Sequence, residues 1–234
     1  MDSAKTNNGL NSKRALLLVG SPRGLKSTSH ALGRYLLKKL EATGIATETL
    51  LVGAALHGEE NTARMLEAVD SADLVVVSFP LYVDQLPAPL IRAIELIASH
   101  RRAHPTARRP KLVAVVQCGF PEAHQNQPAC DILRQFAGEA GFEWAGALAM
   151  GMGGALGGRP LEKAGGMVRN TRQALDLAAE SLSRGEPVPQ DVSALMAKPI
   201  IPKWLYLFFG NRGMRGEAKK HGVLHSVYAR PYEP

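Results

Sequence analysis

The sequence predicts an α/β protein built around a doubly wound sheet of five parallel strands, and three observations support this. Five short apolar runs alternate with five longer segments whose apolar residues recur at helical spacing. The inner runs, such as Asp73–Phe79, are nearly continuous in apolar residues, as in strands buried on both faces. The first run leads into a glycine-containing turn and a hydroxyl-rich helix start, an arrangement that α/β proteins use to bind phosphate.

The first half of the chain supplies two strands and two helices before the central strand. Arg14–Val19 is a short apolar run with no helical period, and Ala46–Val52 is a second strand-like run. Ser27–Thr43 carries leucines at helical spacing and is followed by Gly44, a residue typical of helix ends. Glu59–Asp70 places its apolar residues on one helical face.

The second half repeats the same alternation of strand and helix. The expected strands are Asp73–Phe79, Lys111–Gln117 and Phe142–Met150. The expected helices are Leu86–His100, Gln125–Ala140 and Leu161–Arg184. Pro89 fits the first helix because proline is tolerated in the first turn.

The turn after the first strand is the strongest functional signal. Hydroxyl and basic residues crowd it: Ser21, Arg23, Lys26, Ser27, Thr28 and Ser29. Free backbone N–H groups and the helix dipole favour an anion at such a helix start. A simpler interpretation is that Ser27 or Thr28 only caps the helix. A cap explains one hydroxyl, however, and not the other hydroxyl and basic residues of the turn. We therefore expect a phosphate site.

The spacing of the glycines excludes two common phosphate loops. A P-loop fails because only three residues separate Gly20 from Gly24, and Leu25 separates Gly24 from Lys26. A dinucleotide fingerprint fails at Gly20-Ser21-Pro22. A mononucleotide phosphate remains, which indicates flavin mononucleotide (FMN) in a flavodoxin-like sheet with strand order 2-1-3-4-5.

Two motifs resemble those of the flavodoxin-like NAD(P)H-dependent FMN reductases. GSPR followed by the Ser/Thr cluster resembles their first loop, and Phe79–Glu95 resembles their second loop and following helix. The resemblance covers about residues 14–185 and, less specifically, the tail GNRGMRGEAKKHGV. It implies bound FMN, with NADPH or NADH as co-substrate. Some relatives carry an iron–sulfur cluster on closely spaced cysteines. This chain has only Cys118 and Cys130, which lie far apart in the sequence, so we expect no such cluster.

The expected flavin-binding residues follow strands 1, 3 and 4, because ligands in such sheets lie beyond the carboxyl ends of the strands. They are Ser21, Arg23, Ser27, Thr28, Ser29, Pro80, Leu81, Tyr82, Val83, Cys118, Gly119 and Phe120. The resemblance implies that the Pro80–Val83 loop contacts the ring, and Gly119 lets backbone approach a ligand. Tyr82 either stacks on the ring or packs in the core. Cys118 fits a small buried neighbour better than a reactive thiol.

Two features near this edge stay open. His124 is a lone loop histidine and is not assigned a catalytic role. Gly151–Gly158, with five glycines in eight residues, is either a lid or a flexible connector. A flavin carries its own redox chemistry, so no catalytic residue and no metal ligand is assigned.

Composition limits the class of protein. The 234 residues carry a net charge of +7, but the charges are scattered, and we expect no nucleic-acid partner. The densest basic cluster, at residues 101–111, is either a solvated loop or a surface that attracts nicotinamide phosphates. Two distant cysteines favour a reducing compartment, here the cytoplasm, and no apolar run is long enough to span a membrane. Residues 1–13 are expected to be a disordered leader.

The C-terminal segment differs from the rest. After the FMN-binding domain at residues 14–185, residues 186–234 contain several prolines and the apolar, aromatic run Ile200–Gly210. Asn211–Val223 is expected to be a basic short helix or loop. We interpret the segment as an arm that packs on the core or on a second subunit, and membrane-surface binding is less favoured. The resemblance also implies a homodimer.

The sequence therefore favours an FMN oxidoreductase that takes hydride from NAD(P)H and passes electrons to a quinone, a nitro or azo compound, or another small acceptor. The alternative is a flavodoxin-like electron carrier that binds FMN and docks with protein partners without nicotinamide. The resemblance implies that such carriers are shorter and acidic, whereas this chain is longer and basic. A flavin-binding regulator without turnover is a third possibility.

Overall fold

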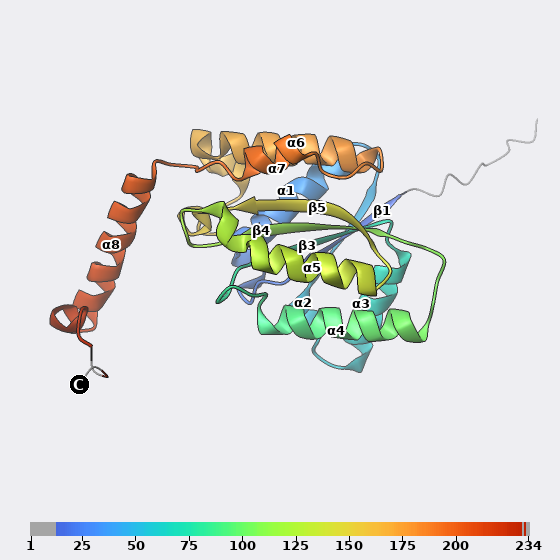
Figure 1. Ribbon diagram of the computed structural model, residues 1–234, viewed down its shortest axis with the longest axis horizontal. Helices are drawn as coiled ribbons and strands as arrows, with labels where there is room; N and C mark the ends of the chain where they lie inside the picture. The colour runs from blue at the N-terminus through green and yellow to red at the C-terminus, as the bar shows by residue number, and fades with distance from the viewer. Residues whose placement is uncertain (1–12, 231, 233–234) are drawn as a thin grey trace, which may run out of the picture.

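The computed structural model describes residues 13–230 and 232, so the predicted leader falls outside it apart from residue 13. Five parallel strands form one sheet in the order β2-β1-β3-β4-β5, which confirms the predicted order (Figure 1). The strands are β1 (Arg14–Val19), β2 (Ala46–Leu51), β3 (Leu74–Pro80), β4 (Lys111–Gln117) and β5 (Glu143–Met150). Every residue of β3 is buried, as its apolar run predicts.

Helices cover both faces of the sheet (Figure 1). One face packs against α1 (Thr28–Glu41), α6 (Arg169–Ser183) and α7 (Gln190–Met196). The other packs against α2 (Val52–Ala55), α3 (Glu59–Ser71), α4 (Ala88–Ala103) and α5 (Gln127–Glu139). Successive residues of a strand point to opposite faces of the sheet, so Leu17 packs in the apolar layer under α1 and Leu16 packs in the layer on the other face. This is the doubly wound arrangement.

Short 3-10 turns fill several of the connections. They are Gly24–Lys26, Ala123–Asn126, Gly153–Ala155, Leu161–Lys163, Gly165–Val168 and Leu224–Ser226. The first three follow the ends of β1, β4 and β5, which places them at the carboxyl edge of the sheet.

The predicted helix Leu161–Arg184 is wrong in its first part. The continuous helix begins only at Arg169, and two 3-10 turns precede it. Gly165 has a φ of +69°, outside the helical range, and it lies beside Gly166. The two glycines interrupt the helix that the spacing of the apolar residues predicts, because glycine is unfavourable inside a helix and adopts other backbone conformations easily.

The C-terminal segment divides into a packed part and a projecting part. Val188 N donates to Ala145 O at 2.8 Å, and Ser193 Oγ donates to Ala147 O at 2.9 Å. Val192 and Met196 are buried in the layer above the sheet. We therefore propose that the domain extends to about residue 200, beyond the boundary expected at residue 185.

The projecting part consists of the helix α8 (Lys203–Lys220) and the 3-10 turn Leu224–Ser226 after it. The helix joins the predicted aromatic run and the predicted basic segment. None of its residues is buried, and it contacts the core through Tyr206, so the interpretation that the arm packs on the core or on a second subunit stays a prediction. Most of the helix stands away from the sheet (Figure 1). In the part of the chain that the structure describes, no helix is long and apolar enough to cross a bilayer.

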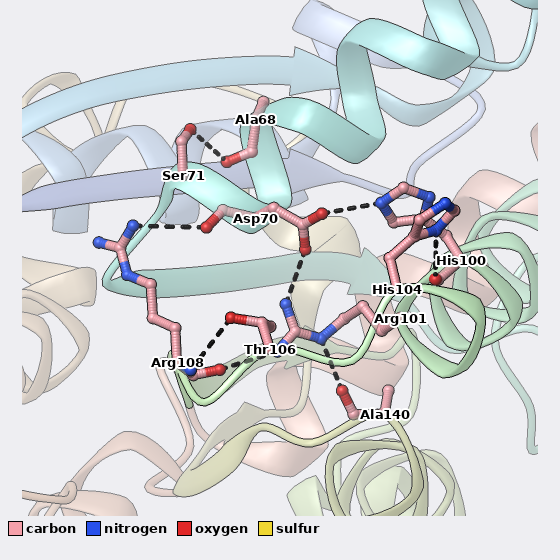
Figure 2. A network of polar contacts seen from close by, with 9 residues as sticks. All are labelled: Ala68, Asp70, Ser71, His100, Arg101, His104, Thr106, Arg108 and Ala140. Atoms are coloured by element: carbon pink, nitrogen blue, oxygen red, sulfur yellow. Dashed lines mark hydrogen bonds and ion pairs between the residues drawn. The ribbon is translucent and has the colours of Figure 1, made fainter.

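A polar network closes the amino-terminal edge of the sheet (Figure 2). Arg101, whose side chain is 4% exposed, donates from Nη1 to Asp70 Oδ1 and from Nε to Ala140 O, both at 2.7 Å. His100 Nε2 contacts the second oxygen of Asp70 at 2.8 Å, and Arg108 pairs with Asp73. Part of the predicted basic cluster is thus engaged within the protein, at the edge opposite the expected flavin site.

Candidate functional site

The turn after β1 is held by hydrogen bonds within itself. Ser27 Oγ accepts from His30 N at 3.0 Å and donates to Gly24 O at 2.6 Å. Ser27 is therefore the N-cap of α1, the role that the simpler interpretation gives it. Gly24 adopts a φ of +54°, which lets the chain turn tightly before the helix.

The next two hydroxyls have different surroundings. Thr28 Oγ1 donates to Gly153 O at 3.1 Å and accepts from Gly158 N at 3.2 Å, so it joins the turn to the loop after β5. Ser29 Oγ is buried and has no hydrogen-bond partner among the described residues. An unpaired buried hydroxyl in the first turn of a helix fits a phosphate ligand.

The remaining turn residues fit the same ligand. Ser21 is buried, and its Oγ accepts from Arg23 N at 3.4 Å. Arg23 and Lys26 are exposed beside it. The turn thus combines buried hydroxyls, a helix N-terminus and two cations, a set of groups that can bind a phosphate.

The glycine-rich loop after β5 packs closely against both neighbouring loops. Its Met152 N donates to Phe120 O at 2.7 Å. A Cβ added at Gly151 would lie 2.4 Å from Pro121 O, and one added at Gly158 would lie 2.1 Å from Lys26 O. Glycine is required where backbone meets backbone this closely. The loop composition therefore reflects packing against the turn before α1.

We expect Gly158→Ala to weaken FMN binding by about tenfold or more, because a backbone shift that costs the bound turn about 1.4 kcal/mol already weakens binding by that factor. The new Cβ would push on Lys26 O and displace the turn. Gly157→Ala is the matched control: Gly157 also has a positive φ, of +57°, but its Cβ would meet nothing within 4 Å. Titration of the apoprotein with FMN measures both. Equal losses in the two variants would contradict a bracing role.

The loop after β3 is a tight turn under backbone strain. Tyr82 N donates to Gln85 O at 2.9 Å, and Gln85 N donates to Tyr82 O at 3.0 Å. Between them Val83 and Asp84 have φ values of 48° and 60°, which is unfavourable for a β-branched residue. Val83 is 95% exposed, and Tyr82 is half exposed, so neither side chain packs in the core. Strain of this kind is typical of loops that contact ligands.

The loop after β4 has exposed backbone at Gly119, with unoccupied space beside it. Leu81 N donates to Gln117 O at 2.8 Å, and Cys118 N donates to Met150 O at 3.1 Å, so the ends of β3, β4 and β5 are joined. Gly119 is exposed, and a Cβ there would meet nothing within 4 Å. Beside it, Phe120 is about half exposed. Burial raises the pKa of the Cys118 thiol, so this side chain stays neutral.

Two residues at this edge were missed by the sequence interpretation. Asn126 is fully buried, and its Nδ2 donates to Ala123 O at 2.9 Å and Met150 O at 3.1 Å, which fixes the loop after β4. Tyr206, from α8, donates its Oη proton to Gly119 O at 2.7 Å. Burial raises the pKa of Tyr206, which keeps this donor protonated. No sequence signal marks either contact.

The predicted site residues thus lie in three loops at one edge of the sheet. The turn with Ser21–Ser29 follows β1, the loop with Pro80–Val83 follows β3, and Cys118–Phe120 follows β4. These are adjacent strands on the two sides of the point where the strand order reverses. His124 is exposed in the 3-10 turn beyond them.

Comparisons with known proteins agree with this fold. An azoreductase from Bacillus anthracis, described as FMN-dependent and solved with FMN, has a TM-score of 0.52 at 11% identity, covering 73% of this chain and 99% of its own. The Trp repressor binding protein from Bacillus subtilis has a TM-score of 0.53 at 12% identity, covering 69% and 98%. At these identities the likeness shows the fold alone. No curated protein matches the sequence.

The family model of the NADPH-dependent FMN reductases matches residues 14–142. The match begins with β1 and includes all three loops of the site. Because it covers more than half of the chain, the protein belongs to the NADPH-dependent FMN reductase family and is an oxidoreductase that uses FMN with NAD(P)H as co-substrate.

Proposed function

We propose that FMN binds across the three loops at the carboxyl edge of the sheet, with its phosphate in the turn before α1. The observation that carries this proposal is the buried, unpaired hydroxyl of Ser29 in the first turn of α1, which follows a turn that contains the buried Ser21 and the exposed Arg23. These groups would donate hydrogen bonds to a phosphate and neutralise its charge. Thr28 and the N-cap Ser27 would stabilise the conformation of the turn through their hydrogen bonds to Gly153 O and Gly24 O.

The ring would lie between the loop after β3 and the loop after β4. The chemistry that bound FMN supplies is hydride acceptance followed by electron transfer. The exposed Tyr82 would then limit how a nicotinamide or an acceptor approaches, and Gly119 would leave room for the ring. No acid or base side chain is assigned, since positioning accounts for the reaction.

We propose that the electron acceptor is a small molecule, a quinone or a nitro or azo compound. The half-exposed Tyr82 and Phe120 would provide an aromatic surface for such planar compounds, and an azoreductase shares the fold. We also propose a homodimer, as the family resemblance implies. A cytoplasmic location is supported by the two cysteines, which are both free and buried.

Release and mass analysis of the bound cofactor test the proposal. We expect FMN, because the turn provides one phosphate site and no adenosine-binding fingerprint follows it. The same preparation should then oxidise NADPH or NADH in the presence of a quinone, nitro or azo compound. Release of FAD would contradict the phosphate assignment, and turnover with none of these acceptors would contradict the acceptor class.

A further inference from the structure

The helix α8 exposes large apolar side chains that nothing in the described chain covers. Trp204 and Met214 are each 70% exposed, and Phe208 is 57% exposed. In Figure 1 the helix stands away from the sheet and its covering helices. Exposed apolar surface of this kind usually marks an interaction site.

These side chains share one side of the helix. Trp204, Leu207 and Phe208 are spaced by three and four residues, and Met214 follows within an arc of about 120° at 100° per residue. We call this set the aromatic stripe. The opposite side carries Tyr206, which contacts the body through Gly119. The stripe therefore faces away from the protein.

Positive charge borders the aromatic stripe. The helix contains five basic residues and one acidic residue. Within residues 13–230, the side chains of Arg212, Arg215 and Lys219 form no ion pair. They line a groove of about 630 Å³ together with Phe208 and Leu224. Cations and apolar groups thus meet on one surface.

We propose that this face of α8 docks on the surface of an anionic phospholipid bilayer. Aromatic side chains favour the boundary between headgroups and acyl chains, and unpaired arginine and lysine favour lipid phosphates. A second copy of α8 would bring like charge against like charge, which disfavours it as the occupant. The proposal concerns a helix lying on the surface, not one that crosses the bilayer.

The base of α8 is fixed to the flavin-site edge. Lys203 pairs with Glu122, and Tyr206 bonds to Gly119 in the loop after β4. A docked α8 would therefore hold that edge near the bilayer. The inference does not depend on the electron acceptor, because its test measures binding and not turnover.

Co-sedimentation of the full-length, FMN-loaded protein with vesicles tests the proposal. One set of vesicles contains phosphatidylglycerol and phosphatidylcholine, and the other contains phosphatidylcholine alone. We expect binding to the anionic set that weakens with added salt. Replacing Arg212, Arg215 and Lys219 by glutamine should weaken it on the order of 100-fold. Equal binding to both lipid sets, or binding to neither, would overturn the proposal.

A paired substitution tests the aromatic stripe itself. Trp204→Ala with Phe208→Ala should weaken vesicle binding about 100-fold, since two large apolar groups no longer enter the interface. Phe209→Ala is the matched control, because Phe209 is about as exposed as Phe208, at 59%, but lies about 140° from Trp204 around the helix and touches the stripe only through an edge-on contact with the Phe208 ring. It should bind vesicles as the unmodified protein does. If the double variant binds normally but loses its dimer mass, the stripe is an interface between copies and the proposal is wrong.

Discussion

Replacing Arg101 with methionine is expected to lower the free energy of unfolding by about 2–4 kcal/mol, because it removes the hydrogen bonds of a buried guanidinium to the half-buried Asp70 carboxylate and to a backbone carbonyl. The guanidinium is held by Asp70 Oδ1 and Ala140 O and lies 4.6 Å from the centroid of the Phe142 ring. Methionine fills similar volume but donates no hydrogen bond. Asp70 and Ala140 O would then each lose a donor (Figure 2).

Arg102→Met provides the matched control for this substitution. Arg102 is the next residue of α4, is exposed, and forms no ion pair with any described residue. Its replacement should change the unfolding free energy by no more than about 0.5 kcal/mol. Urea titration followed by circular dichroism measures both variants. Similar stabilities for the two would show that the Asp70–Arg101 network contributes little to the fold.

Gly119→Val is expected to lower kcat/KM for NAD(P)H oxidation on the order of 100-fold, because misplacement of reacting groups by about 1 Å has an effect of that size. The Cβ of residue 119 would meet no protein atom within 4 Å, so the fold should keep its stability. The valine would instead occupy the space proposed for the ring. Thermal unfolding of the apoprotein separates this effect from damage to the fold.

His124→Ala is the companion variant. His124 is exposed in the 3-10 turn beyond the loop and is not assigned to proton transfer. Steady-state rates should be measured with both variants loaded with flavin. We expect the histidine variant to retain nearly full turnover. Loss of turnover in His124→Ala with near-normal rates in Gly119→Val would identify an acid–base centre and refute the positioning account.

The fold was largely predictable because hydrophobic pattern and strand burial agree. The observed β1 and β4 have the predicted bounds, Arg14–Val19 and Lys111–Gln117, since both are apolar runs that end in polar or glycine-containing turns. The pattern was less informative where glycine overrides it, as at Gly165 before α6. The four-residue α2 is too short to give a periodic signal.

The meeting of the three candidate loops at one edge of the sheet was predictable, whereas the contacts within and between the loops were less so. The motif indicated a phosphate turn, but it could not separate the N-cap Ser27 from the unpaired Ser29. The bond between Tyr206 and Gly119 joins residues 87 positions apart, and only tertiary packing brings them together. The bracing by Gly158 likewise depends on how closely two backbones approach.

The most direct test of the central claim is the absorbance of the purified protein near the flavin maximum under anaerobic conditions. If the three-loop edge holds FMN and accepts hydride from NAD(P)H, the visible band bleaches on addition of NADPH or NADH and returns when an acceptor is added. Gly119→Val, loaded with FMN, should bleach far more slowly. A flavin band that neither nucleotide bleaches would contradict the account and favour an electron carrier reduced by a protein partner.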